Sequence, residues 1–372
     1  MMKICKKCIQ PDTRPGIYFD ENNVCGACLW EVEKKSIDWK KRFQELQKIA
    51  DGAKSIASTY DCVIGVSGGK DSTLQAITAR DRLGLRCLLV NGEPENITDL
   101  GKKNIENLKQ LGFDIITLKP NSKIMKKLIK RDFNKYLNPV KITEYSLWAS
   151  SYIIADKFDI PLIIQGENPS LTLGVSQTDL KKDDNALDAD LQNTVKSGWH
   201  EYCEIDGITE EDLFLFHYDK QNLIKKNIKG VWIQYYLKEW SMRANADFAK
   251  KYGMEQRHES FDPHDVGTYL PFQSLDSDLG PLNQMLKFIK FGFGFTMDHV
   301  CYDIRENILS RSEAIKLVKE YDGQCSEDYI QKFCNYISIS KDEFWSTVEK
   351  FRGSMWISNS GKKWHNTVWD HF

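Results

Sequence analysis

Apolar positions in the first half of the chain alternate between the period of a helix and that of a strand. Residues 43–57 carry one helical stripe, and the β-branched run at residues 61–66 predicts a short buried strand after it. The same pattern predicts helices at residues 72–83, 99–111 and 144–158 and strands at residues 85–90, 113–118 and 161–165. Strands that alternate with helices predict an α/β fold built on a doubly wound parallel sheet.

The second half of the chain follows a different pattern. The apolar run at residues 231–236 is too short for its period to separate a strand from a helix, and we favour a fifth strand. Beyond residue 261 the apolar spacing is helical, at residues 282–291, 312–321, 328–336 and 341–351. We therefore expect three parts, an N-terminal module of residues 1–35, an α/β domain of residues 36–260 and a mainly helical region of residues 261–372.

The composition is that of a folded protein with almost no overall charge. Of the 372 residues, 41% are hydrophobic and 28% are charged, and 51 Lys and Arg against 53 Asp and Glu give a net charge of −2. A field so close to neutral argues against nucleic acid as the partner. The N-terminus has no apolar signal segment and no apolar run is long enough for a membrane span, so we expect a cytoplasmic protein.

Two stretches depart from this neutral balance. Residues 102–141 hold eleven basic and three acidic residues, whereas residues 179–212 hold eleven acidic and three basic ones. Apolar residues recur at helical spacing among the lysines between residues 124 and 137, which favours a solvated helix face over a nucleic-acid surface. The acidic stretch has little periodicity and predicts a long insertion at about residues 170–228.

The sharpest chemical signal is the hexapeptide Ser67-Gly68-Gly69-Lys70-Asp71-Ser72, which lies between a predicted strand and a predicted helix. Adjacent glycines permit positive φ angles and close approach of a ligand, so that successive N–H groups can bind an anion at the helix N-terminus. Lys70 adds a cation, and two serine hydroxyls add donors. Asp71 would repel phosphate unless a divalent cation lay between them, which implies a nucleotide bound with Mg²⁺. The alternative is a plain turn in which Asp71 or Ser72 caps the helix.

The spacing of this hexapeptide differs from the mononucleotide P-loop and from the dinucleotide-binding GxGxxG motif. It resembles the SGGxDS pyrophosphate loop (PP-loop) of the ATP pyrophosphatases, a superfamily that includes GMP synthetase, asparagine synthetase and tRNA thiolation enzymes. The resemblance implies that residues 67–72 bind the pyrophosphate released from ATP. It also implies that the ends of later strands, Asn91-Gly92 and Gly166-Glu167-Asn168, border the adenine, the ribose and the acceptor.

Four cysteines near the N-terminus form two Cys-x2-Cys pairs, Cys5 with Cys8 and Cys25 with Cys28. Their separation is that of a zinc knuckle or ribbon. The surrounding segment has too few apolar residues to fold alone, so a bound metal would supply its folding energy. Structural Zn²⁺ is the favoured interpretation, and the alternatives are a redox dithiol, an iron–sulfur cluster or four unligated thiols. Four protein ligands would leave no open position, so we assign this site no chemistry.

Five segments together carry a family resemblance. They are the segment from Cys5 to Cys28, the hexapeptide, Gly166-Glu167-Asn168, Lys290-Phe291-Gly292-Phe293-Gly294 and Asp303-Ile304-Arg305. In this combination the chain resembles, over nearly its full length, the N-acetyl sugar amidotransferases of surface-polysaccharide (lipopolysaccharide) and flagellin-glycan biosynthesis. The resemblance implies an ATP-dependent, AMP- and pyrophosphate-forming C–N ligase that converts an acetamido group of a sugar to an acetamidino group. The acceptor would be a nucleotide-linked sugar or a nonulosonic acid.

The chemistry of an amide explains why such an enzyme would need ATP. Resonance makes the carbonyl a poor electrophile, so its oxygen would first be adenylated, and ammonia would then displace AMP. The candidate catalytic residues are Asp71, Glu167 as a metal-binding or ammonia-orienting carboxylate, and Lys290 as a second cation for pyrophosphate. No Cys–His arrangement recommends itself as a glutaminase. The family resemblance instead implies a separate glutaminase with a barrel partner that supplies the ammonia.

Two other functions share parts of this pattern. A tRNA thiolation enzyme would use the same adenylation chemistry on a base, and the basic stretch favours it. The near-neutral charge and the lack of a second cysteine pair within the α/β domain argue against it. A zinc-bearing nucleotide sensor would keep the phosphate loop without turnover.

Overall fold

A five-stranded parallel sheet forms the centre of the structure, a computed structural model that describes residues 2–175, 184–187, 198–359 and 363–372. The spatial order of the strands is β3-β2-β1-β4-β5. Their bounds are β1 (Cys62–Gly65), β2 (Cys87–Gly92), β3 (Asp114–Leu118), β4 (Leu162–Gln165) and β5 (Lys229–Trp232). All neighbouring strands pair in parallel, so the predicted doubly wound α/β sheet is confirmed.

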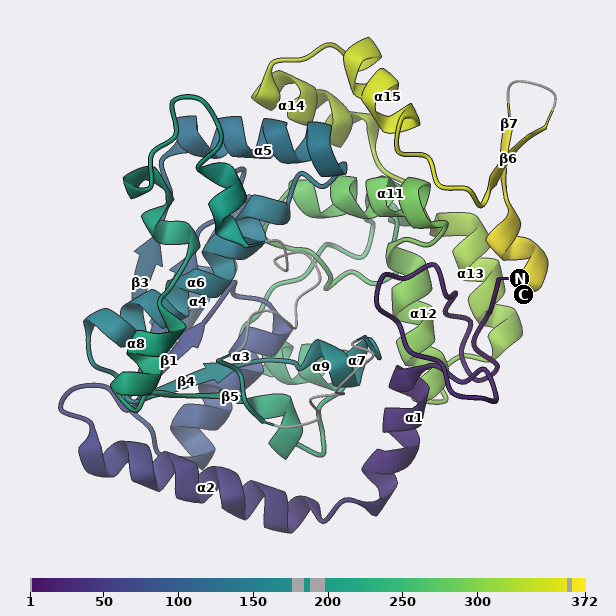
Figure 1. Cartoon of the computed structure of the whole chain (residues 1–372). Helices are drawn as coiled ribbons and strands as arrows, with labels where there is room; N and C mark the ends of the chain where they lie inside the picture. Colours follow the sequence, from purple (N-terminus) through teal and green to yellow (C-terminus); the bar gives the residue numbers. More distant parts are fainter. Residues whose placement is uncertain (1, 176–183, 188–197, 360–362) are drawn as a thin grey trace.

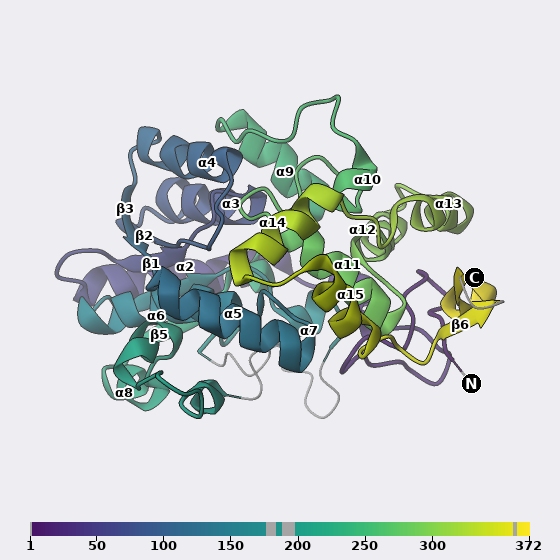
Figure 2. The same ribbon diagram turned by 90° about the horizontal axis from the view of Figure 1, so that it is seen from above.

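Helices cover both faces of this sheet. Ile64 of β1 packs with α2 (Trp39–Ile56), α3 (Lys70–Ile77) and α4 (Asp99–Gln110). Val63, the neighbouring residue, points to the other face and packs with α6 (Lys141–Lys157) and α8 (Lys220–Lys225). Figure 2 shows α3 and α4 on one side of the strands and α6 and α8 on the other. Burial on both faces explains why β1, β2 and β4 appear in the sequence as apolar runs, whereas the edge strand β3 is only partly buried.

The predicted fifth strand is confirmed at its start and wrong beyond Trp232. Residues 233–236 form the 3-10 turn η6 (Ile233–Tyr236) instead of continuing β5. Two hydrogen bonds of Gln234 account for this difference. The Gln234 N–H donates to the Gly166 carbonyl at 3.1 Å, and the Gln234 side-chain oxygen accepts from the Asn168 N–H at 2.9 Å. The chain therefore leaves the sheet to support the loop that follows β4.

The C-terminal region is helical, as predicted, and ends in a hairpin that was not predicted. The predicted helices are α11 (Leu279–Phe291), α13 (Arg311–Tyr321), α14 (Glu327–Ile337) and α15 (Lys341–Glu349), and the hairpin is β6 (Trp356–Asn359) with β7 (Lys363–Asn366). Helices α11, α14 and α15 pack on α5 (Ser122–Tyr136) of the α/β part. The N-terminal segment packs on α12 (Phe295–Arg305) and α13, so the two ends of the chain lie close together (Figure 1). The boundaries at residues 35 and 260 stay predictions.

The remaining helical segments are short, α9 excepted. They are α1 (Gly26–Glu33), η1 (Lys34–Ser36), η2 (Thr78–Arg82), α7 (Pro169–Thr172), η4 (Trp199–Tyr202), η5 (Glu211–Phe216), α9 (Met242–Lys251), α10 (Pro263–Val266) and η7 (Thr367–His371). Within the described ranges, no helix combines the length and the apolar character that a membrane crossing requires.

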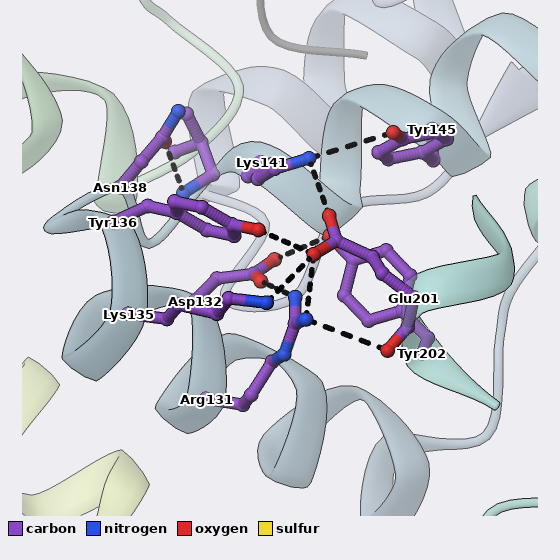
Figure 3. A network of polar contacts seen from close by, with 10 residues as sticks. Arg131, Asp132, Lys135, Tyr136, Asn138, Lys141, Tyr145, Glu201 and Tyr202 are labelled. Atoms are coloured by element: carbon purple, nitrogen blue, oxygen red, sulfur yellow. Dashed lines mark hydrogen bonds and ion pairs between the residues drawn. The ribbon is translucent and has the colours of Figure 1, made fainter. Parts of the chain in front are cut away.

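The basic and acidic stretches meet inside the structure. Glu201 of η4 forms ion pairs with three cations of the basic stretch, Arg131 (2.6 Å), Lys135 (3.2 Å) and Lys141 (3.1 Å). Figure 3 shows these cations converging on the Glu201 carboxylate, to which Tyr136 donates a further hydrogen bond. The amphipathic helix predicted for the basic stretch is confirmed as α5. Residues 176–183 and 188–197 of the predicted acidic insertion lie outside the described residues.

This network makes Glu201 a stability determinant. Because its side chain is only 12% exposed and faces several cations, we expect Glu201→Ala to lower the free energy of unfolding. The loss should be about 3 kcal/mol, the usual cost of leaving buried charges without their partner. Urea unfolding followed by circular dichroism measures it. Glu204→Ala, at a nearby exposed position, is the control, and equal unfolding midpoints for the two variants would contradict the assignment.

Candidate active site

The hexapeptide lies where the order of the sheet reverses. β1 and β4 are neighbours, and from this pair the chain extends to β2 and β3 on one side and to β5 on the other. The loop after β1 is the hexapeptide, and the loop after β4 is Gly166-Glu167-Asn168. Open α/β sheets bind ligands in the crevice beyond the carboxyl ends of the strands at such a reversal. The topology therefore brings two sequence-predicted segments to one edge.

The two glycines of the hexapeptide serve different purposes. Gly68 has a φ of +75°, and a Cβ there would lie 2.8 Å from a backbone carbon of Asn104, so the fold itself requires glycine. Gly69 has an ordinary φ of −78° and precedes α3 as its N-cap. A Cβ at Gly69 would meet only the Ser67 hydroxyl, at 3.4 Å. The space beside Gly69 is therefore not needed by the protein's own packing.

The loop side chains are held by a second segment that sequence reasoning missed. Lys70 Nζ donates to Asp71 at 2.8 Å and lies 3.5 Å from the side-chain oxygen of Gln273. The Asn245 amide of α9 donates to the other Asp71 oxygen at 2.7 Å. Together with residues 272–276, the hexapeptide lines a cavity of about 110 Å³, which we call the loop cavity. Lys70 and Asp71 are thus held together as a pair in its wall.

A second cavity adjoins the loop cavity. This central cavity has a volume of about 160 Å³ and shares Lys70, Asp71 and Gln273 with the loop cavity. Glu167 lines it from the end of β4, and Asp298 and His299 line it from α12. The predicted grouping of Lys70, Asp71 and Glu167 around one space is therefore present in the structure.

The charge state of Glu167 is set by its position in this cavity. Its side chain lines the cavity and is accessible to solvent there. Partial desolvation by the surrounding protein, together with the charge of Asp71, raises the pKa of Glu167 to about 7, although Lys70 opposes the shift. Asp71 and Glu167 therefore face one small space together with Lys70, which already pairs with Asp71.

The α12 residues of the central cavity differ in charge state. Burial lowers the pKa of His299 to about 3, so the imidazole is neutral near pH 7, and its Nδ1 shares a 2.7 Å hydrogen bond with Thr268. Burial opposes ionisation of Asp298, but Arg14 and Lys287 outweigh it and hold the Asp298 pKa below its ordinary value. His299 and Asp298 sit on an amphipathic helix with no recognisable motif, so no sequence signal identified them.

The other predicted site residues are more dispersed. Asn91 and Gly92 are buried at the end of β2, where a Cβ on Gly92 would lie 3.3 Å from the Leu147 Cα of α6. A Cβ on Gly166 would lie 2.7 Å from the Gln75 amide of α3, so this glycine permits close packing of β4 on α3. Lys290 lines neither the loop cavity nor the central cavity but a third space, described below.

The four N-terminal cysteines form a buried cluster whose geometry fits a tetrahedral metal. All four Sγ atoms lie within 4.8 Å of one another, with Cys5 and Cys28 separated by 3.8 Å and Cys8 and Cys25 by 3.7 Å. Four sulfurs placed about 2.3 Å from a zinc ion would be about 3.8 Å apart. Backbone N–H groups also donate to two of the sulfurs, Cys5 and Cys8. The cluster is therefore compatible with structural Zn²⁺, which would hold the segment folded.

The comparison with known families concerns the C-terminal third of the chain. Residues 248–370 match the family described as "LPS biosynthesis protein WbpG-like, C-terminal domain". The matched region contributes Gln273, Asp298 and His299 to the central cavity. No curated protein gives a significant match to the chain. The similarity thus relates this part of the protein to lipopolysaccharide biosynthesis without specifying a reaction.

Proposed function

We propose that this protein is an ATP-dependent amidotransferase that converts an acetamido group of a sugar to an acetamidino group. The observation that carries the proposal is the position of the hexapeptide where the strand order reverses. The hexapeptide leaves unfilled space beside Gly69, and it lines two adjoining cavities, one of which is also lined by Glu167. The similarity of residues 248–370 to WbpG-like lipopolysaccharide biosynthesis proteins supports a sugar as the acceptor.

The reaction would proceed in two steps at this site. The acetamido oxygen attacks the α-phosphate of ATP, which forms an O-adenylyl imidate and releases pyrophosphate. Ammonia then adds at the imidate carbon, and AMP leaves with the original oxygen. Lys70 and the first N–H groups of α3 would bind the departing pyrophosphate in the loop cavity. Catalysis then rests on positioning and charge stabilisation.

The carboxylates of the central cavity fit a magnesium ion. Mg²⁺ in nucleotide sites is bound by one or two carboxylates together with substrate phosphates, where it neutralises charge on the phosphates. Asp71 and Glu167 would hold it, because both line the cavity and the charge of Asp71 raises the Glu167 pKa. The neutral His299 would accept or donate hydrogen bonds there without adding charge.

The ammonia would come from a separate glutaminase with a barrel partner. Within the described ranges, the exposed Cys203 has no thiol–imidazole hydrogen bond, and the nearby His200 ring stacks on Trp199 instead. A thiol without an adjacent base lacks the activation that a glutaminase nucleophile needs.

A pyrophosphate-release assay tests this proposal. The protein is incubated with ATP, isotopically labelled ammonium and a panel of N-acetylated sugars, and the sugars are then examined by mass spectrometry. We expect pyrophosphate release that depends on the sugar, with replacement of the acetamido oxygen by labelled nitrogen. Release driven only by tRNA would instead assign a tRNA thiolation enzyme, and the absence of release with every acceptor would assign a nucleotide sensor.

The raised pKa of Glu167 predicts a pH dependence of nucleotide binding. A metal ligand must lose its proton, so the affinity for Mg²⁺–ATP should rise between pH 6 and pH 8 as Glu167 ionises near its pKa of about 7. Calorimetric titrations at several pH values measure the affinity for Mg²⁺–ATP. The same titrations with Glu167→Gln give the pH dependence that comes from protonation of ATP itself, which is then subtracted. If the variant retains the same slope as the original protein, Glu167 is not the metal ligand.

A further inference from the structure

A third cavity lies beside the central cavity and is larger than it. This side cavity has a volume of about 240 Å³ and shares Leu173 with the central cavity. Its walls come from the N-terminal segment between the cysteine pairs, the connection between α5 and α6 with the start of α6, α7 with the residues that follow it, and α11 with the residues that follow it. Four separate parts of the chain thus line one space next to the proposed active site.

An ion-pair cluster forms the partition between the two cavities. Asp298 lines the central cavity, while its two cationic partners, Arg14 and Lys287, line the side cavity. Lys287 Nζ lies 2.7 Å from Asp298, and Arg14 forms the second ion pair. The one carboxylate compensates one of the two cations, and burial raises the pKa of the other carboxyl group in the lining, Glu144, to about 7, so positive charge exceeds negative charge in the walls.

Lys290 adds a further positive charge to the same space. Its Nζ donates to the Tyr136 backbone carbonyl at 2.6 Å, a neutral acceptor. Burial alone lowers the pKa of Lys290 to about 8, since no charged group in the described part of the chain contributes to the shift, and the ammonium is still mostly protonated at pH 7. A partly buried cation without an opposite charge is costly, and an anionic ligand would remove that cost.

The remaining lining suits a sugar ring. The side-chain amide N–H groups of Asn138 and Asn283 can donate to the oxygens of hydroxyl groups. Leu137, Leu173 and Val175 offer apolar contacts. At about 240 Å³ the cavity is slightly smaller than the roughly 300–1,000 Å³ of usual small-molecule sites, so it suits a ligand portion of about the size of one sugar unit.

We propose that the side cavity is the acceptor site, in which Lys290 binds a carboxylate or phosphate carried by the N-acetylated sugar. The inference rests on the proposed amidotransferase function and adds the location of the acceptor site and the residue that binds the anionic group of the sugar. The bound sugar would extend past Leu173 so that its acetamido group reaches the central cavity, where Lys70 and Glu167 lie. In this assignment Lys290 contacts the acceptor and not the pyrophosphate.

Direct binding measurements test the assignment separately from the adenylation chemistry. The probes are N-acetylneuraminic acid for a carboxylate, N-acetylglucosamine 1-phosphate for a phosphate and N-acetylglucosamine as the neutral reference. Calorimetry is run without nucleotide and again with a non-hydrolysable ATP analogue. We expect at least one anionic probe to bind about tenfold more tightly than the neutral one, the advantage of one charge-assisted contact. The anionic probe that binds more tightly than the neutral one shows whether the site recognises a carboxylate or a phosphate.

Two variants make the test specific. Lys290→Gln should reduce this preference to less than about twofold, whereas Lys350→Gln, on the exposed surface, should leave it intact. Asn283→Asp adds a negative charge to the cavity wall and should lower the affinity for the anionic probes only. This second variant tests the proposal even if Lys290→Gln does not fold. Equal affinity for all probes, a preference that survives in Lys290→Gln, or displacement of the anionic probe by pyrophosphate would each overturn the proposal. None of these outcomes depends on whether ATP is cleaved.

Discussion

Gly69→Ala is expected to slow sugar-dependent pyrophosphate release by about 100-fold or more while leaving the fold intact. The φ of −78° suits alanine, and the nearest atom to the new methyl group would be the Ser67 hydroxyl at 3.4 Å. The methyl group would instead occupy the space in which phosphate oxygens approach the backbone. Loss of backbone donors to a transferring or departing oxyanion costs about 100-fold or more in rate, and we expect a reduction of that size.

The measurement combines steady-state pyrophosphate release with a thermal unfolding curve. Gly52→Ala is the matched control, because a Cβ there has no neighbour within 4 Å in the middle of α2. It should leave activity unchanged and stabilise the helix by up to about 1 kcal/mol. Wild-type activity in Gly69→Ala would show that the loop does not hold phosphate, and unfolding of the variant would contradict the spare space described at Gly69.

Much of the fold follows from local pattern. The strands β1, β2 and β4 are buried on both faces, so each appears as an apolar run, whereas the edge strand β3 is only partly buried. Helices α4 and α5 each carry one apolar stripe. The end of β5 could not be predicted in this way. Gln234 leaves the sheet because it bonds to Gly166 and Asn168, two partners more than sixty residues earlier in the chain. Periodicity carries no information on such a contact.

The candidate site was predictable only where its chemistry is contiguous in sequence. The hexapeptide combines glycines, a cation and hydroxyls within six positions, and its placement after β1 could be predicted from the apolar pattern. Gln273, Asp298 and His299 reach the same cavities from a region some two hundred residues later, with no motif around them. The sequence also grouped Lys290 with the phosphate loop, whereas the packing of α11 places it on the side cavity. Residues gathered by tertiary packing leave no local signature.

Cys25→Ser is expected to release the metal and unfold the N-terminal segment. The cluster is fully enclosed, and removal of one thiolate would destroy a tetrahedral set of four. Structural zinc contributes about 10 kcal/mol or more to the folding of small metal-dependent modules, so this segment should become protease-sensitive. Metal content by inductively coupled plasma mass spectrometry and limited proteolysis measure both effects. Zinc rather than iron in the original protein would also exclude the iron–sulfur alternative.

Cys25→Ser should also have an indirect effect on the proposed active site. Arg14 lies between the two cysteine pairs in sequence and forms the ion pair with Asp298 that separates the central and side cavities. The cluster is itself tied to the C-terminal helices, since Arg311 of α13 donates to the Cys5 carbonyl at 2.9 Å. We therefore expect Cys25→Ser to weaken binding of the anionic sugar probes, whereas Cys203→Ser, at an exposed cysteine outside the cluster, should change neither metal content nor binding. Zinc retained by Cys25→Ser would contradict the assignment of Cys25 as a metal ligand. Loss of zinc with normal binding of the probes would show that the metal module does not position Arg14 and that the partition between the cavities is stable without it.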